Sequence, residues 1–284
     1  MATGYSILLF DTHKTTRNGY IIRTIRNALD RHDKVKEVAL AQYGNACELA
    51  QLRRPDILIA FGGSGGDEAL LDRLVRLCGF SVLWTTEDPY EVATNTQLAQ
   101  SFDLVFSNDA SCVEAYGARG NHLALAACRD LHKLQPIEDD KDFLYDVLFV
   151  GSAWPNRVKQ IRDIMRLAGP DLKYKVGLPI NPFLPEPKLG DRHQVTDWRV
   201  PVDQFIHLAN RSRITLGLTR VFSTDATSKA QGSTPPPRIF EVAAAGAFQL
   251  VENLSGELGN YFKLGKELVA CRNAEEFAEG IRYY

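Results

Sequence analysis

Arg238 and Glu241 are the charged side chains whose types and spacing point most directly to chemistry. They are three residues apart in the segment 234–252, where a run of prolines precedes apolar residues at helical spacing. Prolines fit the first turn of a helix, so the pattern predicts a helix that begins at Pro237 and ends at Gly246. Residues three apart share one helical face. Because desolvating charge is costly, we expect this pair to meet a ligand or to form a simple salt bridge.

Two segments of the first half place titratable side chains directly after predicted strands. Glu87 and Asp88 are adjacent acids at a strand end, and Asp88 is followed by proline. Such an acid can act as a general base, or it can cap the helix expected to begin near Tyr90. His13 follows the strand predicted at 6–10, where it is either a second site residue or an ordinary loop histidine.

A glycine-rich loop follows the third predicted strand. The segment Gly62–Gly66 contains four glycines between a strand and a helix, so a ligand could approach the backbone of Gly62 and Gly63. It matches neither the dinucleotide-binding nor the P-loop pattern. The alternative is a tight turn that requires positive φ.

Strict alternation of strands and helices over about 125 residues predicts a doubly wound α/β domain with a parallel sheet. Ligands of such sheets bind outside the carboxyl ends of the strands. The predicted strands of this half are 6–10, 38–43, 56–61, 81–84, 104–107 and 122–125.

The alternation begins again after a charged segment that lacks apolar periodicity. We therefore expect an N-terminal Rossmann-like domain at 1–129, a linker at 130–142 and a second Rossmann-like domain at 143–284. The strand predicted at 145–150 is followed by a loop and a helix from Arg157.

The R-x-F-E-x-x-A-x-G pattern that begins at Arg238 resembles the C-terminal signature of GT-B glycosyltransferases, most closely the CgeB-type spore-maturation family. The segments Trp84–Pro89 and Val150–Arg157 resemble other parts of that family. The resemblance implies two Rossmann-like domains facing across a cleft. It also implies that Glu241 binds the ribose of a nucleotide diphosphate sugar.

The same resemblance implies roles for further residues. Asp88 or His13 would act on the acceptor or on the donor sugar from the N-terminal domain. Ser233 departs from the family-4 pattern, in which many members have a second Glu at that position. The residues expected to lie near the diphosphate or elsewhere along the donor are Arg238, Arg157, Arg220, Lys229, Gly151, Ser152 and Gly246, with Gly62 and Gly63 as further candidates.

We therefore expect a metal-independent glycosyltransferase that moves a sugar from a UDP- or GDP-linked donor to an acceptor hydroxyl of unknown identity. Cationic side chains and helix dipoles would stabilise the leaving diphosphate. Three alternatives remain open: a catalytically silent GT-B protein that binds a nucleotide or glycan, a non-glycosyl GT-B enzyme such as an epimerase, and a two-lobed binding protein of periplasmic type.

Composition excludes other classes. The chain has 284 residues, 45% of them hydrophobic and 24% charged, and a net charge of −2, which argues against a nucleic-acid-binding protein. Its five cysteines show no C-x-x-C spacing, so neither a zinc site nor a disulfide framework is indicated. Without a signal segment or a membrane-length apolar run, we expect a cytoplasmic location and no membrane span. The sequence ends within a helical pattern, so we expect the second domain to lack the two C-terminal helices usual in the family.

Overall fold

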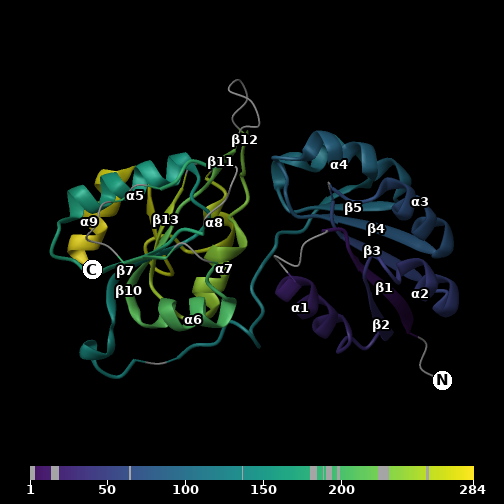
Figure 1. Cartoon of the computed structure of the whole chain (residues 1–284), viewed down its shortest axis with the longest axis horizontal. Coiled ribbons are helices and arrows are strands. Elements are labelled where there is room, and N and C mark those ends of the chain that lie inside the picture. The colour runs from purple at the N-terminus through teal and green to yellow at the C-terminus, as the bar shows by residue number, and fades with distance from the viewer. Residues whose placement is uncertain are drawn as a thin grey trace. The chain divides into compact units, whose positions relative to one another are not determined.

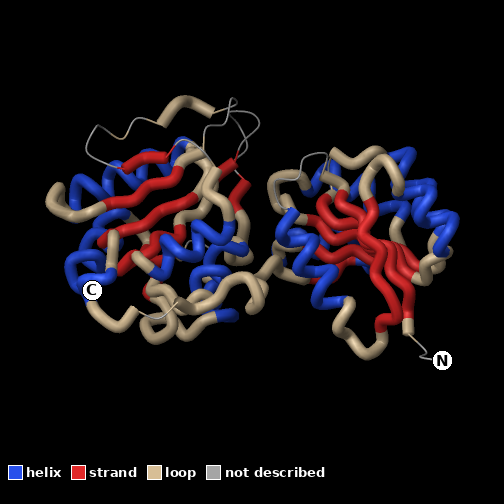
Figure 2. The backbone as a smooth tube through the Cα atoms, turned by 60° about the horizontal axis from the view of Figure 1, so that its bottom comes forward, coloured by secondary structure: helices blue, strands red, loops and turns tan. Residues whose placement is uncertain are grey.

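The computed structural model describes residues 4–13, 19–63, 65–135, 137–179, 184–187, 189, 194–196, 199–222, 230–253 and 256–284. The chain forms two compact units, Met1–Leu125 and Ala126–Tyr284. Each unit contains its own parallel β-sheet with helices on both faces (Figure 1, Figure 2). We call them unit 1 and unit 2.

Unit 1 contains six parallel strands in the spatial order β2-β1-β3-β4-β5-β6. The chain moves outward in opposite directions from β1 and β3, so a topological switch point lies between these two strands. The strand bounds are β1 Tyr5–Asp11, β2 Val35–Ala41, β3 Ile57–Gly62, β4 Phe80–Thr85, β5 Leu104–Ser107 and β6 Gly120–His122.

Alternating side chains of β1 face opposite cores, as expected of a strand that is buried on both faces. Leu8 and Phe10 pack with α2 (Ala46–Arg53) and α3 (Glu68–Leu77). Ile7 and Leu9 pack with Ile22 of α1 (Gly19–Leu29) on the other face. Two further elements complete the first of these layers, α4 (Val92–Leu98) and the 3-10 segment η3 (Ala110–Arg119).

Unit 2 contains a second sheet of six parallel strands, in the order β14-β13-β10-β7-β8-β9. In chain order this is the 3-2-1-4-5-6 arrangement of the Rossmann fold, with its switch point between β7 and β10. The strand bounds are β7 Tyr145–Val150, β8 Tyr174–Gly177, β9 Gln194–Thr196, β10 Ser212–Gly217, β13 Gln249–Glu252 and β14 Val269–Cys271.

The faces of the second sheet are also divided by strand alternation. Val147 and Phe149 of β7 pack with α5 (Pro155–Ala168) and α9 (Ala274–Tyr283). Leu148 and Val150 pack with helices on the other face, α6 (Val202–Asn210) and α7 (Pro237–Ala244). Figure 1 shows α5 and α9 side by side on one face of this sheet, with α6 and α7 on the other.

The predicted α/β class with two Rossmann-like parallel sheets is confirmed. Strand β7 matches its predicted range, and helix α7 begins at Pro237 as predicted. The elements that were not predicted include β9, the short helix α8 (Leu258–Tyr261), and the antiparallel pair β11 (Val221–Phe222) and β12 (Ala230–Gln231). Residues 126–135, partly assigned to a linker, belong to unit 2: the backbone N–H of Gln135 donates to Asn210 Oδ1 at 2.9 Å.

Candidate functional site

At the switch point of unit 2, two side chains of the first turn of α5 bind the backbone that follows β10. The guanidinium of Arg157 donates to the carbonyl of Leu218 through Nε at 3.1 Å and Nη2 at 2.8 Å, and Nε is also 3.2 Å from the carbonyl of Thr219. Asn156 Nδ2 donates to the same Thr219 carbonyl at 3.1 Å. Arg157 therefore has a structural role in this geometry, because it joins α5 to the end of β10. The structure does not support the expected contact between Arg157 and the diphosphate.

Gly151 is required by close packing at the end of β7. A Cβ on Gly151 would lie 2.9 Å from Cζ of Phe149 and 3.3 Å from Nη1 of Arg157. Its N–H donates to the carbonyl of Gly177 at 3.0 Å. Ser152 follows on the exposed side, and its carbonyl accepts from the N–H of Trp154 at 2.9 Å. Gly151 and Ser152 thus follow β7 at the carboxyl edge of the unit 2 sheet, and their contact with a donor stays a prediction.

Glu252, at the end of β13, is a rim residue that the sequence reasoning missed. Its Oε2 accepts the N–H of Thr219 at 2.8 Å and a short hydrogen bond from the Thr219 hydroxyl. Its Oε1 accepts from Gln160 Nε2 of α5 at 3.0 Å. The carboxylate thereby joins the ends of β13 and β10 to α5. An acid directly after the mainly apolar run 248–251 was the available signal.

A narrow pocket of about 20 Å³ opens beside this carboxylate. It lies at the carboxyl ends of β10 and β13, next to the beginning of α7. Ser233, the position that departs from the family-4 pattern, is on its wall. The other lining residues are Thr219, Gln231, Gly232, Thr234, Pro235, Pro236, Ile239, Glu252, Asn253 and Leu258.

Arg238 and Glu241 form an ion pair on the first turns of α7. Nη1 of Arg238 is 3.0 Å from Oε2 of Glu241, whose side chain is 2% exposed, while that of Arg238 is 33% exposed. The guanidinium also stacks on Phe205 of α6, with Cζ 3.7 Å from the ring centroid. The structure therefore contains the expected salt bridge, with Arg238 as its solvent-facing member.

His132 is a second residue that the sequence reasoning missed, because it lies in the segment assigned to the linker. Its Nε2 is 3.6 Å from Glu241 Oε1, and its Nδ1 accepts from the N–H of Cys128 at 3.0 Å. Burial lowers the pKa of His132, although the Glu241 carboxylate opposes that shift. We treat His132 as neutral, since 3.6 Å is longer than a hydrogen bond and Arg238 already compensates the charge of Glu241.

Two other residues that were predicted to lie near the sugar-nucleotide donor are Gly246 and Arg220. Gly246 follows the carboxyl end of α7, at the opposite end of the helix from Pro237, so the expectation that it contacts the donor is not supported. Its φ of +69° ends the helix, and a Cβ there would lie 2.7 Å from Leu134 Cδ1. Arg220 follows β10, with Cζ 5.9 Å from the ring centroid of Trp154. Lys229 lies outside the described residues.

A larger pocket of unit 2, about 380 Å³, lies at the amino ends of β7 and β8 beneath α6. Parallel sheets of this kind bind their ligands at the opposite edge. We therefore place the candidate site of unit 2 at the switch point and not in this pocket. Its walls are formed by Tyr145, Lys175, Val200, Asp203, Gln204, His207 and Leu208.

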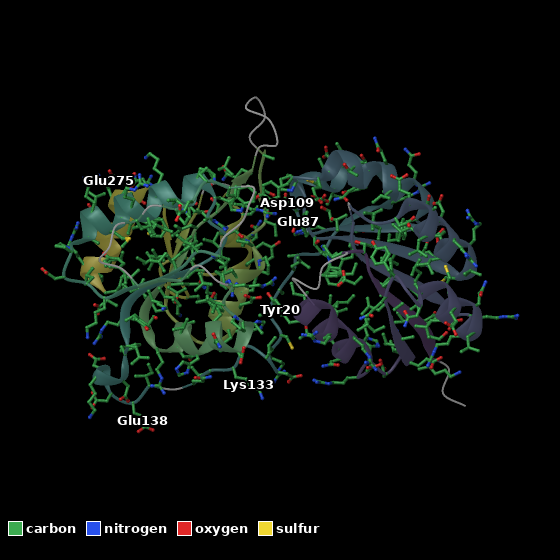
Figure 3. All side chains as sticks on the ribbon, in the orientation of Figure 1. Tyr20, Glu87, Asp109, Lys133, Glu138 and Glu275 are labelled. Carbon is green, nitrogen blue, oxygen red and sulfur yellow. The ribbon has the colours of Figure 1, made fainter. Side chains whose placement is uncertain are left out.

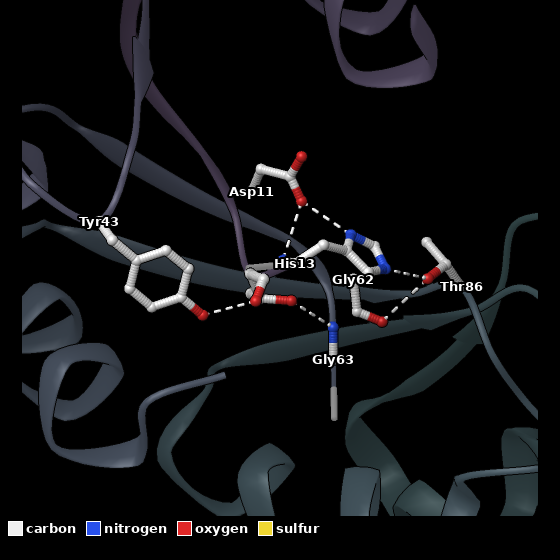
Figure 4. Close-up of polar contacts among 7 residues, drawn as sticks. Asp11, His13, Tyr43, Gly62, Gly63 and Thr86 are labelled. Atoms are coloured by element: carbon white, nitrogen blue, oxygen red, sulfur yellow. Dashed lines mark hydrogen bonds and ion pairs between the residues drawn. The ribbon is translucent and has the colours of Figure 1, made fainter. Parts of the chain in front are cut away.

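In unit 1, His13 and Asp11 form a hydrogen-bonded dyad at the switch point (Figure 4). Nδ1 of His13 is 2.7 Å from Asp11 Oδ1, and Nε2 is 3.1 Å from Thr86 Oγ1. Thr86 Oγ1 donates to the carbonyl of Gly62 at 3.2 Å, so it can accept a hydrogen from Nε2. Both ring nitrogens are then donors, which is the arrangement of an imidazolium. The hydrogen bond to Asp11 raises the pKa of His13 accordingly, against the opposing effect of burial.

The glycine loop is packed closely against the same side chains. Gly62 has φ +134°, and a Cβ there would lie 2.2 Å from Thr12 Oγ1. Gly63 has φ +108°, and a Cβ there would lie 2.5 Å from Asn95 Oδ1. Its N–H donates to Thr12 Oγ1 at 2.9 Å. These contacts support the alternative of a tight turn that only glycine can form, since the Gly63 amide already has a partner within the protein.

Asp88 lies beneath this rim and is 2% exposed. Its Oδ2 accepts hydroxyl groups at 2.6 to 2.8 Å, and its Oδ1 accepts Asn95 Nδ2 at 2.7 Å. The expectation that Asp88 acts as a base is not supported by this geometry, because a carboxylate with four donors and almost no exposure is not accessible to an acceptor. The hydroxyl donors are those of Thr85, Ser107 and Tyr116.

Glu87 and Asp109, also on this rim, come from the ends of neighbouring strands β4 and β5 (Figure 3). Asp109 caps η3 through the N–H of Ser111 at 3.0 Å. Within the described ranges, no three His, Cys, Asp or Glu side chains are grouped so that they could hold a metal ion. Among the same residues, every helix is too short or too polar to cross a membrane.

Known structures share the two-domain fold of this chain. A DNA-modifying β-glucosyltransferase, determined with and without uridine diphosphoglucose, matches with a TM-score of 0.59 and 11% identity over 98% of this chain and 88% of that one. An α-glucosyltransferase in complex with UDP and DNA matches with a TM-score of 0.57 and 12% identity over 89% and 81%.

A Listeria monocytogenes protein assigned as a UDP-N-acetylglucosamine 2-epimerase matches equally well, with a TM-score of 0.59 and 10% identity over 98% of this chain and 87% of that one. At these identities the likeness establishes the fold alone. No curated protein matches the chain in sequence.

A family model described as glycosyl transferase-like matches residues 129–284, which include the whole rim of unit 2 described above. This match covers more than half of the chain. The protein therefore belongs to the glycosyl transferase-like family and has a GT-B fold.

Proposed function

We propose that the protein is a glycosyltransferase that binds a nucleotide diphosphate sugar at the carboxyl edge of the unit 2 sheet. The observation that supports this most is that the family match covers residues 129–284, nearly all of unit 2, whose switch point is lined by polar and charged side chains. In the reaction, the bond between the anomeric carbon and the diphosphate oxygen breaks. A bond to the acceptor oxygen forms, and the acceptor hydroxyl loses its proton.

UDP-linked sugars are the first donors to test. Two of the similar structures were determined with UDP or uridine diphosphoglucose, while GDP-linked donors remain in the proposal. Arg238 is the cation that the leaving diphosphate would meet, with Arg220 and the backbone at Gly151 and Ser152 nearby on the rim. The donor chemistry needs no metal in this proposal. The acceptor in this proposal is a compound that carries a hydroxyl group.

Glu241 has two possible roles that the same experiment separates. The resemblance to CgeB-type proteins implies that Glu241 binds the ribose hydroxyls. Its burial against Arg238 instead favours a role in orienting that guanidinium. A ribose role predicts that Glu241→Ala weakens uridine, UMP and UDP binding alike, by roughly 1–3 kcal/mol. An orienting role predicts that only the diphosphate loses affinity.

His13 is the candidate group of unit 1 for proton transfer or for contact with the donor sugar. Its pairing with Asp11 holds a proton on the ring, so it would act as an acid or as a cation before it could act as a base. Asp88 acts in this proposal as a structural residue of the same rim. Gly62 and Gly63 allow the close packing of the loop.

Calorimetric titration of the purified protein with UDP, UDP-glucose, UDP-N-acetylglucosamine and GDP-mannose tests the proposal. Binding that is lost in Arg238→Gln, together with sugar transfer or donor hydrolysis, is the expected result. Binding without turnover would identify a silent GT-B protein. Conversion of the bound sugar into its epimer, followed by NMR, would identify an epimerase, which the shared fold with the Listeria protein also allows.

A further inference from the structure

The pocket beside Glu252 is too small for a sugar ring but large enough for one polar group. Its volume of about 20 Å³ corresponds to the space of one water molecule. It lies at the carboxyl ends of β10 and β13, directly beside the first turn of α7, where the donor diphosphate is proposed to bind. A group that enters it must therefore belong to the part of the donor next to that diphosphate.

The charge of the described lining residues disfavours a phosphate oxygen in this pocket. Its described lining residues include one acid, Glu252, and no lysine or arginine. A carboxylate on the wall repels an anion but accepts a hydrogen from a neutral hydroxyl. Ser233 and Asn253 add short polar side chains to the lining, which also includes the apolar residues Ile239 and Leu258.

Glu252 has one acceptor position that its contacts with the described residues do not use. A carboxylate offers about four lone-pair directions. Thr219 occupies two of them at Oε2, and Gln160 occupies one at Oε1. The remaining lone pair is on Oε1. The three hydrogen bonds fix the side chain, so this acceptor has a defined position. A preorganised acceptor in a pocket of one-hydroxyl size is suited to selecting a hydroxyl group.

We propose that Glu252 is a specificity-determining residue that accepts a hydrogen bond from one hydroxyl of the donor sugar. The carboxylate reaches the pocket from the end of β13, and Ser233 is among the other residues that line it. The inference rests on the proposed function and adds to it the group that recognises the sugar, as distinct from the nucleotide.

A ligand–variant cycle tests the inference. Calorimetry would measure the binding of UDP, of the preferred UDP- or GDP-sugar, and of that donor's monodeoxy analogues to the wild type and to Glu252→Gln. Glutamine retains an oxygen for Thr219, and Gln160 can turn its amide to match, so the variant should fold. Glu279→Gln on the exposed face of α9 is the matched control.

We expect the wild type to bind one deoxy analogue about ten-fold more weakly than the intact donor. In Glu252→Gln that preference should fall by about five-fold, while the affinity for UDP alone stays unchanged and Glu279→Gln matches the wild type. An unchanged sugar preference, or an equal loss for UDP and for the sugar nucleotide, would overturn the inference. A wild type that binds no nucleotide sugar would instead overturn the proposed function, and the inference with it.

Discussion

Nη1 of Arg238 lies 3.0 Å from Oε2 of Glu241, and the two side chains differ sharply in exposure. The carboxylate is buried next to neutral His132, whereas the guanidinium spreads over Phe205 and remains one-third exposed. The carboxylate of Glu241 thus holds the guanidinium of Arg238 in place at the rim of unit 2. Any anion that approaches α7 meets the guanidinium before it meets the carboxylate.

This arrangement predicts that Glu241→Gln lowers the free energy of unfolding. The variant leaves Arg238 without its charged partner, and we expect a loss of about 1–3 kcal/mol, reduced by solvent screening of the exposed guanidinium. Urea unfolding monitored by circular dichroism measures it. Glu279→Gln, an exposed change of the same kind, should stay within about 0.5 kcal/mol of the wild type. Equal stability of both variants would mean that the pair contributes nothing to folding.

Asp88→Asn should destabilise the protein more than it changes chemistry. The carboxylate accepts hydrogen bonds from three hydroxyl groups and one amide, and an asparagine would direct its NH₂ group toward some of these donors. We expect a loss of about 2–4 kcal/mol in urea unfolding. Asp33→Asn, on the exposed surface, is the control. If Asp88→Asn folds with wild-type stability and loses only turnover, the residue is a catalytic base after all.

Gly62→Ala should be far more damaging than Gly44→Ala. At Gly62 both a φ of +134° and a distance of 2.2 Å from the new Cβ to Thr12 Oγ1 oppose the substitution. At Gly44 nothing lies within 4 Å of a new Cβ. We expect a loss of more than about 2 kcal/mol for the first variant and less than about 0.5 kcal/mol for the second, in thermal or urea unfolding. A well-folded Gly62→Ala variant would contradict the close packing of this turn.

The sequence was sufficient for most strands of the two sheets but not for β9 or for the partners of the site residues. Strand runs and helical periodicity depend on neighbours in the chain, so elements such as β7 and α7 could be predicted. The role of Asp88 depends on Ser107 and Tyr116, which fold back from 19 and 28 residues away. No local pattern encodes that contact.

The same limit applies in unit 2. Arg157 looked like a ligand residue because a basic side chain after a rim loop often binds phosphate. The structure instead places it on the carbonyls of Leu218 and Thr219, about 60 residues further along the chain. Glu252 and His132 were missed for the same reason. Each becomes a site residue only through contacts with distant segments, as when His132 meets Glu241.

The Asp11–His13 dyad predicts a measurable shift in a histidine titration. The hydrogen bond from Nδ1 of His13 to Asp11 Oδ1 raises the pKa of His13 above the ordinary value of about 6.5. NMR of the histidine ring protons should therefore show a midpoint above that value in the wild type and a lower midpoint in Asp11→Asn. Exposed His32 serves as an internal control, since Asp11→Asn does not alter its surroundings.

The raised pKa of His13 also predicts how the free energy of unfolding changes with pH. Folded His13 binds its proton more tightly than unfolded His13, so its contribution is fully present below the unfolded pKa and is lost as pH rises through the folded pKa. The difference in unfolding free energy between the wild type and Asp11→Asn should be largest near pH 6 and shrink toward pH 9, values chosen to bracket the expected titration. Thr86→Val removes only the partner of Nε2, so it should leave most of this pH dependence in place. A difference that grows with pH would show that His13 is neutral in the folded protein, and that the dyad orients an imidazole instead of holding an imidazolium.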